Sequence, residues 1–518
     1  MSDKYKEIKR QSKSKKQVKS SGSLSIISKG LDSNPLTRVI KEIFTNKSLF
    51  AKVGITILII MIFRAMATIP LPGIDMDVYQ EFFGASNATE SNYLFTLFTG
   101  GQLDSPSIVG LGIAAFINAS IIIQLLTPVI PKLHELSKEG QTGNQRIQQY
   151  TRYLTLPLSF MYSSAYILFL SRRDLTSGST SISSATDVGR FLISSADGSQ
   201  WPSIAKVIFM ALILTAGSLF VMWLSELITE KGIGNGSSII IAIGILSSLP
   251  GYIRNDFSGL NILDAIGEVL SGSFAILTTS DILILVGIIV GAILTVISIV
   301  FINESVRKLK IQYARRARGD EGEGAHFPIK LTVSGVMPMI FGSALLSAPQ
   351  LIVPLIENFA DSDSWLINFA NDVKASFLYS NSDGIVDGKD SIYTLVYFTL
   401  IVAFSMFYSF VIMKPKDAAE NLQKSGGFMP GIRPGASTEK FISNVLLKIS
   451  FAGGLFLGFI ALLPLVSRYL IQYTTGINIA LLSGIGGSSI LIIISVIIDT
   501  ARQYSALKAT RSYEKYVN

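Results

Sequence analysis

The sequence predicts an all-α integral membrane protein, and three observations support this: the composition, the apolar runs and the distribution of basic residues. The chain has 518 residues, of which 49% are hydrophobic and only 15% charged, and its mean hydropathy is +0.48. Soluble domains carry about 25% charged residues. Soluble domains built from this chain would therefore lack the charge needed to cover their surfaces.

The apolar runs have the length of membrane-spanning helices. Spanning a bilayer takes about 20 mostly apolar residues, and ten runs near that length contain few charges. The runs are 53–69, 108–127, 154–170, 204–228, 237–253, 282–302, 331–356, 392–413, 449–466 and 479–498. The alternation and short spans of an outer-membrane barrel do not occur. The prediction is a bundle of ten transmembrane helices.

The basic residues predict the orientation of this bundle. If the N-terminus is cytoplasmic, the segments on that side hold 35 of the 44 Lys and Arg residues, and the outer segments hold 7. Short cytoplasmic loops carry such an excess of cations. We therefore expect both termini in the cytoplasm, the C-terminal one as a short tail over 511–518.

Residues 1–50 are basic and rich in serine, without hydrophobic periodicity, which predicts a disordered cytoplasmic tail. Two roles are open for this tail. It can fix the orientation and touch anionic lipid, at about 1 kcal/mol per cation near the surface, or it can contact ribosomal RNA.

The sequence shows little sign of an enzyme active site. It has no cysteine and two histidines, His134 and His326, so a metal centre is not expected. The segment 232–236, Gly-Ile-Gly-Asn-Gly, looks superficially like a dinucleotide fingerprint but lacks the preceding strand and the third spaced glycine. We expect no catalytic residue, no cofactor and no ATP hydrolysis by this chain.

Small and polar residues occupy the middle of two of the ten runs. They are Asn118, Ser120 and Gln124 in the second run, and Ser334, Ser343 and Ser347 in the seventh. One interpretation is ordinary packing and hydrogen bonding between helices. The other is a wettable seam between these two helices.

Two cytoplasmic loops, 303–330 and 414–448, are longer and more basic than connectors need to be. The second contains Gly-Gly-Phe-Met-Pro-Gly-Ile-Arg-Pro-Gly, a turn-forming stretch that presents Arg433. Solvated positive-inside loops are one interpretation, and we favour a docking surface for a cytosolic macromolecule. Its candidate residues are Arg307, Lys308, Arg315, Arg316 and Arg433.

Together, short motifs along the chain resemble the SecY family, the pore subunits of the general protein-translocation channel. The matching segments extend from about residue 53 to 507. They are 69–75, 118–126, 136–140 with 149–153, 232–236, 312–316, 334–338, 430–435 and 486–489. Each is weak alone, and their common order along the chain makes the resemblance specific.

The resemblance implies two pseudo-symmetric halves of five helices, 51–253 and 254–510, around an hourglass pore. It places an aliphatic ring at the constriction, at Ile113, Ile117, Ser237, Ile241, Ile340 and Ile492. Ser237 departs from the family, which usually has isoleucine there. The second and seventh helices form the implied lateral gate, with Asn118, Ser120, Gln124, Ser334 and Ser343.

The resemblance also implies a plug at about 92–104 that fills the outer funnel at rest. Its residues are Tyr93, Leu94, Phe95, Leu97, Phe98, Gly100 and Gly101. The implied function is translocation of unfolded secretory polypeptides and lateral release of transmembrane segments into lipid.

The implied partners are SecE, SecG, the SecA ATPase, the ribosome, signal-sequence-bearing polypeptides and membrane lipids. The implied location is the plasma (inner) membrane of a bacterium, with an organellar membrane as the other setting. The competing hypothesis is a ten-helix secondary transporter of a small solute, which calls for midplane charges or broken helices.

Overall fold

The computed structural model describes residues 47–72, 106–172, 204–259, 279–313, 326–359, 365, 388–475 and 487–517. Each of the ten apolar runs overlaps a helix within these ranges, so the predicted all-α class is confirmed. The expected tail over 1–50, the plug, and Arg315 and Arg316 lie outside the described residues.

Two sets of long helices follow one another along the chain. The first set is α3 (Lys47–Ala67), α6 (Ala114–Leu126), α8 (Gln141–Arg172), α9 (Ile204–Lys231) and α10 (Gly236–Gly259). The second set is α12 (Thr279–Glu304), α13 (Met337–Phe359), α15 (Gly388–Met413), α17 (Ala436–Thr475) and α19 (Gly487–Val517). We call these sets the N-terminal half and the C-terminal half.

Within the described residues, five helices are long and apolar enough to cross a membrane: α3, α9, α15, α17 and α19. A sixth candidate is α6 together with the short helix α7 (Pro131–Lys138), which are bent by 96° relative to each other. The count of ten spans stays a prediction.

The second helix begins later than its apolar run predicts. Residues 108–113 form turns, and α6 starts at Ala114. This stretch is tied to the end of the first helix, because Leu71 N donates to Pro106 O at 3.0 Å and Ile108 N donates to Ile69 O at 3.1 Å. Val109, Leu111 and Ile113 of the turn are buried all the same, which explains why hydropathy alone extends the helix too far.

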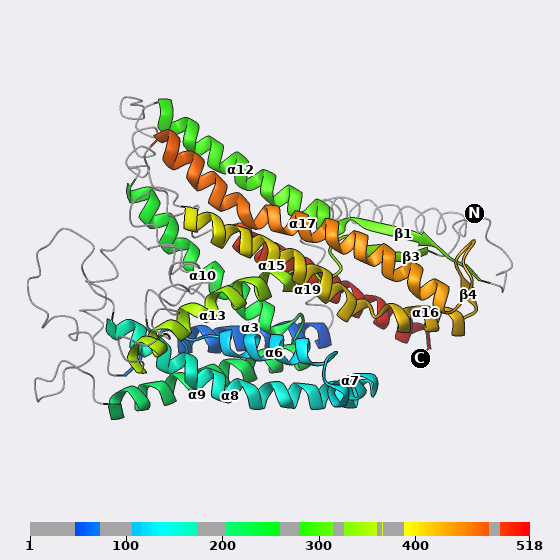
Figure 1. Ribbon diagram of the computed structural model, residues 1–518, viewed down its shortest axis with the longest axis horizontal. Coiled ribbons are helices and arrows are strands. Elements are labelled where there is room, and N and C mark those ends of the chain that lie inside the picture. The colour runs from blue at the N-terminus through cyan, green and yellow to red at the C-terminus, as the bar shows by residue number, and fades with distance from the viewer. Residues whose placement is uncertain are drawn as a thin grey trace, which may run out of the picture.

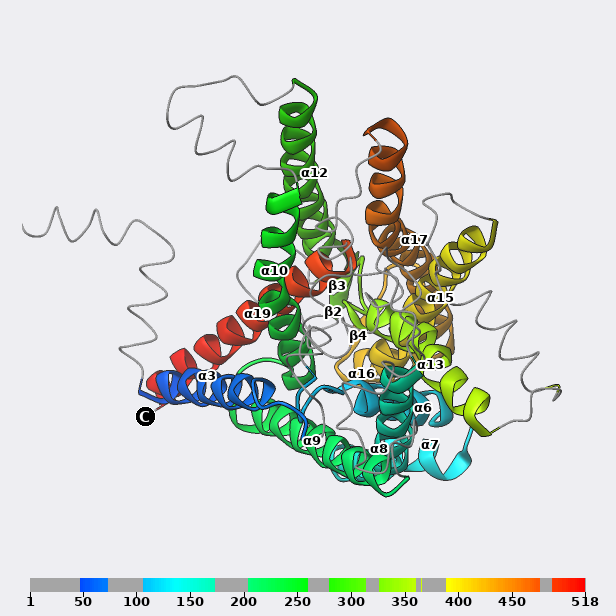
Figure 2. The same ribbon diagram turned by 90° about the vertical axis from the view of Figure 1, so that its left-hand side faces the viewer.

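The helices pack as two neighbouring groups (Figures 1 and 2). In the N-terminal half α8 packs against α6 and α9, and α3 packs against α9. In the C-terminal half α15 lies between α13 and α17, and α19 contacts α12 and α17. The main contacts between halves are those of α13 with α6 and α8, and of α10 with α19. A buried hydrophobic cluster joins the halves at the centre.

The two basic loops fold together at one end of the molecule (Figure 1). Strand β1 (Val306–Lys310) pairs with β3 (His326–Lys330), and β2 (Gln312–Tyr313) of the first loop pairs with β4 (Gly427–Phe428) of the second. A hydrophobic cluster beneath these strands includes residues of α16 (Pro415–Lys424) and of the first turns of α17. We call this unit, β1–β4 with α16 and the loop 429–435 that follows β4, the loop body.

Candidate functional site: a central apolar constriction

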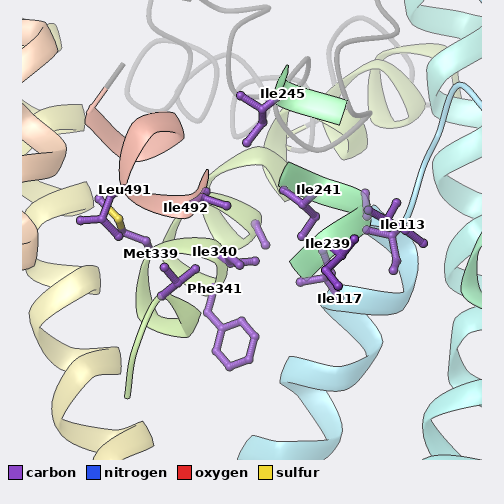
Figure 3. Close-up of a cluster of buried hydrophobic side chains, with 14 of the residues drawn as sticks. Ile113, Ile117, Ile239, Ile241, Ile245, Met339, Ile340, Phe341, Leu491 and Ile492 are labelled. Carbon is purple, nitrogen blue, oxygen red and sulfur yellow. The ribbon is translucent and has the colours of Figure 1, made fainter. Parts of the chain in front are cut away.

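Five aliphatic side chains from four segments of both halves meet at the centre of the molecule. All five belong to one buried cluster, and none is more than 4% exposed. They are Ile113 before α6, Ile117 on α6, Ile241 on α10, Ile340 on α13 and Ile492 on α19. In Figure 3 the residues of the N-terminal half face those of the C-terminal half. These are the five isoleucines of the predicted ring.

Further residues of the same helices belong to this cluster, together with residues of α3, α9, α12, α15 and α17. They include Ile239 and Ile245, on either side of Ile241 in α10, and Met339, Phe341 and Leu491, each next to a ring isoleucine in the sequence (Figure 3). Phe341 also packs edge-on against Tyr408 of α15, with the ring centroids 5.4 Å apart. Sequence reasoning did not assign these residues, because nothing in their type separates them from other apolar residues of membrane helices.

Ser237 occupies the first turn of α10, one turn before Ile241, and is half-buried. Its hydroxyl donates to Asn235 Oδ1 at 2.8 Å, and its backbone N–H points to the same oxygen at 3.2 Å. The hydroxyl and the backbone N–H of Ser237 are therefore both hydrogen-bonded to the side chain of Asn235, which directly precedes α10.

The glycine-rich turn 232–236 joins α9 to α10, and its backbone groups have protein partners. Ile233 N donates to Thr56 Oγ1 of α3 at 3.1 Å, Gly234 N to Gln503 Oε1 of α19 at 2.9 Å, and Gly236 N to Thr229 Oγ1 at 2.9 Å. A phosphate site needs free amides, so the likeness of this segment to a nucleotide fingerprint has no functional meaning.

Glycine at 234 and 236 is required for this turn. Gly234 has φ +94°, and a Cβ there would lie 2.6 Å from Ile239 Cδ1. A Cβ on Gly236 would lie 1.8 Å from the carbonyl oxygen of Ser225 on α9. At this turn α9 and α10 therefore cross closely, and hydrogen bonds to α3 and α19 hold the turn in place.

Helices α6 and α13, the second and seventh of the predicted ten, contact each other. On α6, Gln124 Nε2 donates to Ser120 Oγ at 2.9 Å. Gln124 Oε1 is buried and accepts no hydrogen bond within the described part of the chain. Asn118, two residues before Ser120, is also buried. Helix α6 therefore carries polar side chains along its length, and one of their buried acceptors is unsatisfied within the described residues.

The serines on the other side of this contact have partners within their own half. Ser343 Oγ donates to Met339 O of its own helix at 2.7 Å. Ser334, in the turn before α13, lies 3.4 Å from Ser405 Oγ of α15, which itself donates to Ser450 O. This geometry favours helix packing as the role of Ser334 and Ser343. The polar side chains available to a wettable seam are therefore those of α6.

The three candidate docking residues that the structure describes lie on the loop body. Arg307, Lys308 and Arg433 are exposed, and Arg433 O accepts a hydrogen bond from Thr438 Oγ1 at 2.9 Å. In the β1–β3 pairing, Lys310 lies opposite His326, and Lys330 lies opposite Val306. Because alternate residues of a strand point to the same side, Lys308, Lys310, His326 and Lys330 share one face of the hairpin. All four of these residues are exposed. Lys310 and Lys330 extend the predicted basic surface, and only strand pairing reveals them.

The arrangement, two sets of long apolar helices joined by a buried apolar cluster, has the fold of a protein-conducting channel. A solved structure titled "The structure of a protein conducting channel" matches with TM-score 0.55 and 16% identity over 88% of this chain and 92% of that one. Sec61 in a canine ribosome-channel complex matches with TM-score 0.52 and 17% identity over 88% and 92%.

Sequence comparison gives the particular family. The family model described as SecY matches residues 107–501. A protein translocase subunit SecY from Halalkalibacterium halodurans is 33% identical over 93% of this chain and 99% of the relative, and one from Streptomyces galbus is 34% identical over 92% and 98%. The chain belongs to the SecY family. The predicted resemblance and the channel function are confirmed, and the solute-transporter alternative is not supported.

Proposed function

We propose that this chain is the central pore subunit of a protein translocase, and that the polypeptide passes through the ring of Ile113, Ile117, Ile241, Ile340 and Ile492. The observation that carries the proposal is their convergence from both halves into one buried cluster. A narrow apolar constriction dewets and so opposes ion flow. A collar of aliphatic side chains from separate helices also widens around a passing chain when the helices move apart.

We place the lateral exit at the contact between α6 and α13. Gln124 and Asn118 make the α6 side polar, which allows water to enter when the seam widens. Apolar segments of a client then reach lipid, where about 0.8 kcal/mol per buried methylene favours partition. The plug over 92–104 is proposed on the family resemblance alone.

Energy for transport is supplied by partners, and the chain itself is proposed to have no enzymatic activity. The exposed cations of the loop body, among them Lys308, Lys310, Lys330 and Arg433, suit a large anionic or acidic partner. A translating ribosome and the SecA ATPase are the proposed partners, with SecE and SecG as accompanying subunits. The Sec61 structures similar to this chain include one in a ribosome-channel complex.

The proposed location is a bacterial plasma membrane, with an organellar membrane as the alternative, and with both termini in the cytoplasm. The loop body, α7 and the end of α19 lie at the same end of the molecule (Figure 1). The excess of Lys and Arg in the loops at this end supports its assignment as cytoplasmic.

Disulfide trapping of a translocating client tests the ring. The chain has no cysteine, so Ile492→Cys introduces a single thiol at the constriction. A client arrested in transit and carrying one cysteine within the pore should form a disulfide with it. Ile293→Cys is the matched control, because Ile293 is 55% exposed on the outer face of α12.

The expected result is client disulfide at position 492 and none at 293. An arrested client that forms equal amounts at both positions, or forms none at Ile492, Ile340 and Ile241 in turn, contradicts the proposed route.

A further inference from the structure

Besides the central cluster, the main helix contacts between the two halves lie in two separate places. On one side, α13 contacts α6 and α8. On the other side, α10 contacts α19, and the 232–236 turn rests on the later part of α19. Figure 2 shows the far end of α19 near α3, across the molecule from α6 and α13. If the α6–α13 seam widens while each half keeps its packing, the α19 side is where the halves must stay together.

Gln503 makes a hydrogen bond between the halves on this side. Its Oε1 accepts from Gly234 N at 2.9 Å. The turn cannot easily shift to follow a displaced partner, because the neighbouring Ile233 N is bound to Thr56 Oγ1 of α3. The close fit of Gly234 against Thr500, whose Oγ1 would lie 3.1 Å from an added Cβ, fixes the same contact sterically.

The adjacent residue on α19 holds the C-terminal half. Arg502 Nη2 donates to Asn303 O at 2.9 Å and to Glu304 Oε1 at 2.8 Å, both at the end of α12. Asn303 Oδ1 accepts from Thr332 Oγ1 at 2.9 Å, in the turn that leads into α13. Its amide group also donates to Ser495 Oγ of α19 at 2.8 Å. Consecutive residues of α19 therefore anchor the N-terminal half and the base of α13.

We infer that Gln503 is a positioning residue for the gate: its bond to Gly234, backed by the Arg502–Asn303–Thr332 chain, is the pivot about which the halves separate. This rests on the proposed function, in which α6 and α13 form the gate. Helices α10 and α19 also carry Ile241 and Ile492, so the pivot sets the spacing of two members of the ring. A loosened pivot weakens the ring packing that favours the closed state.

The test uses the full channel with its partner subunits in membrane vesicles. Gln503→Leu removes the acceptor at similar size, and Gln503→Glu keeps an acceptor oxygen. Ser505→Leu is the matched control, because it adds the same apolar side chain to another exposed position of α19, whose hydroxyl donates to Ala501 O of its own helix. Each variant is combined with Gln124→Cys and Ser343→Cys, and a short thiol crosslinker measures closure of the idle seam.

The second measurement is transport of a client with a weakened signal sequence relative to the same client with an intact one. Loss of one hydrogen bond shifts an equilibrium by about three- to tenfold. We expect Gln503→Leu to lower the seam crosslink and to raise the weak-to-intact transport ratio by about that factor. Gln503→Glu should restore both values, and Ser505→Leu should leave both unchanged.

The outcomes separate the inference from the function on which it rests. If the cysteine pair crosslinks in the otherwise unaltered channel and Gln503→Leu changes neither measurement, the pivot is overturned and the gate stands. The pivot is also overturned if Leu and Glu at position 503 reduce all clients equally, which indicates a purely structural role. If the pair does not crosslink in any background, the gate assignment itself fails and the pivot with it.

Discussion

Replacement of Gly236 by alanine should separate α9 from α10 and disturb the constriction. The added Cβ would lie 1.8 Å from Ser225 O and 2.7 Å from Ser225 C. Both groups belong to the backbone, so no side-chain rotation relieves the contact. The optimal separation between non-bonded carbon atoms is about 3.5–4.0 Å. The two helices must therefore move apart by more than about 1 Å at their closest crossing.

The cost follows from the packing of both helices. Overpacking a tight interior contact costs about 1–3 kcal/mol. Displacement of α10 also shifts Ile239 and Ile241, which lie in the central cluster. For a chain of 518 residues, whose unfolding entropy is about 1 kcal/mol/K, the unfolding midpoint should fall by roughly 1–3 °C. A misaligned ring should also raise ion leakage through the idle channel.

Gly291→Ala is the matched control. Gly291 lies in α12, and nothing lies within 4 Å of a Cβ added to it. Alanine should stabilise that helix by up to about 1 kcal/mol. The measurements are thermal unfolding of the purified protein in detergent and ion conductance in planar bilayers. A Gly236→Ala protein that matches the parent in both midpoint and leak refutes the close α9–α10 crossing and its coupling to the ring.

Two further predictions concern the docking surface and the seal. Arg433→Glu should abolish motor-driven transport of a preprotein into vesicles while the protein remains folded and inserted. Lys440→Glu, at another exposed position, should have a smaller effect on transport. Near-normal transport by the Arg433→Glu channel counts against docking at Arg433. Deleting residues 93–102 should cause a larger single-channel leak in the parent than in a Ser237→Ile background, because isoleucine lengthens the apolar ring. Equal leak with either residue at 237, with and without the deletion, places Ser237 away from the constriction.

The helical fold could be predicted because a membrane-spanning helix is encoded locally. A run of about 20 apolar residues must hydrogen-bond its own backbone in lipid, whatever surrounds it. The polar extensions of the helices carry no such signal. Helix α8 begins at Gln141 and α17 at Ala436, each 13 residues before the start of its apolar run. Their first turns are helical because they pack against α7 or the loop body, which is a tertiary effect.

The strands of the loop body were missed for a related reason. Strand β2 is two residues long, and its partner β4 lies in a loop more than 100 residues later. A pair this short has no periodicity of its own. It forms because Ile311 and Met429, each beside one of the strands, are buried in the same cluster with Leu446 of α17. Hydropathy and turn composition alone therefore predicted only a shaped basic loop.

The prediction of the site residues depended on the family resemblance more than on the chemistry of the residues. Isoleucine is common in membrane helices, so nothing about Ile340 or Ile492 alone marks a constriction, and the family pattern was needed to choose them. The pivot was not predicted at all, because Gly234 and Gln503 are 269 residues apart. A glycine-rich segment without a phosphate motif was a usable clue, since such a segment often marks close backbone approach.

The loop body and the gate are connected through the base of one hairpin. Strand β1 follows α12 after the single residue Ser305, and β3 leads through Leu331 into the turn before α13. Leu331 N donates to Ser305 O at 2.9 Å, and Thr332 is bound to Asn303. No flexible linker separates the hairpin from the helices at this end. A partner that displaces the basic face of the hairpin therefore acts directly on the first turn of α13 and on the Asn303 contacts that hold it to α19.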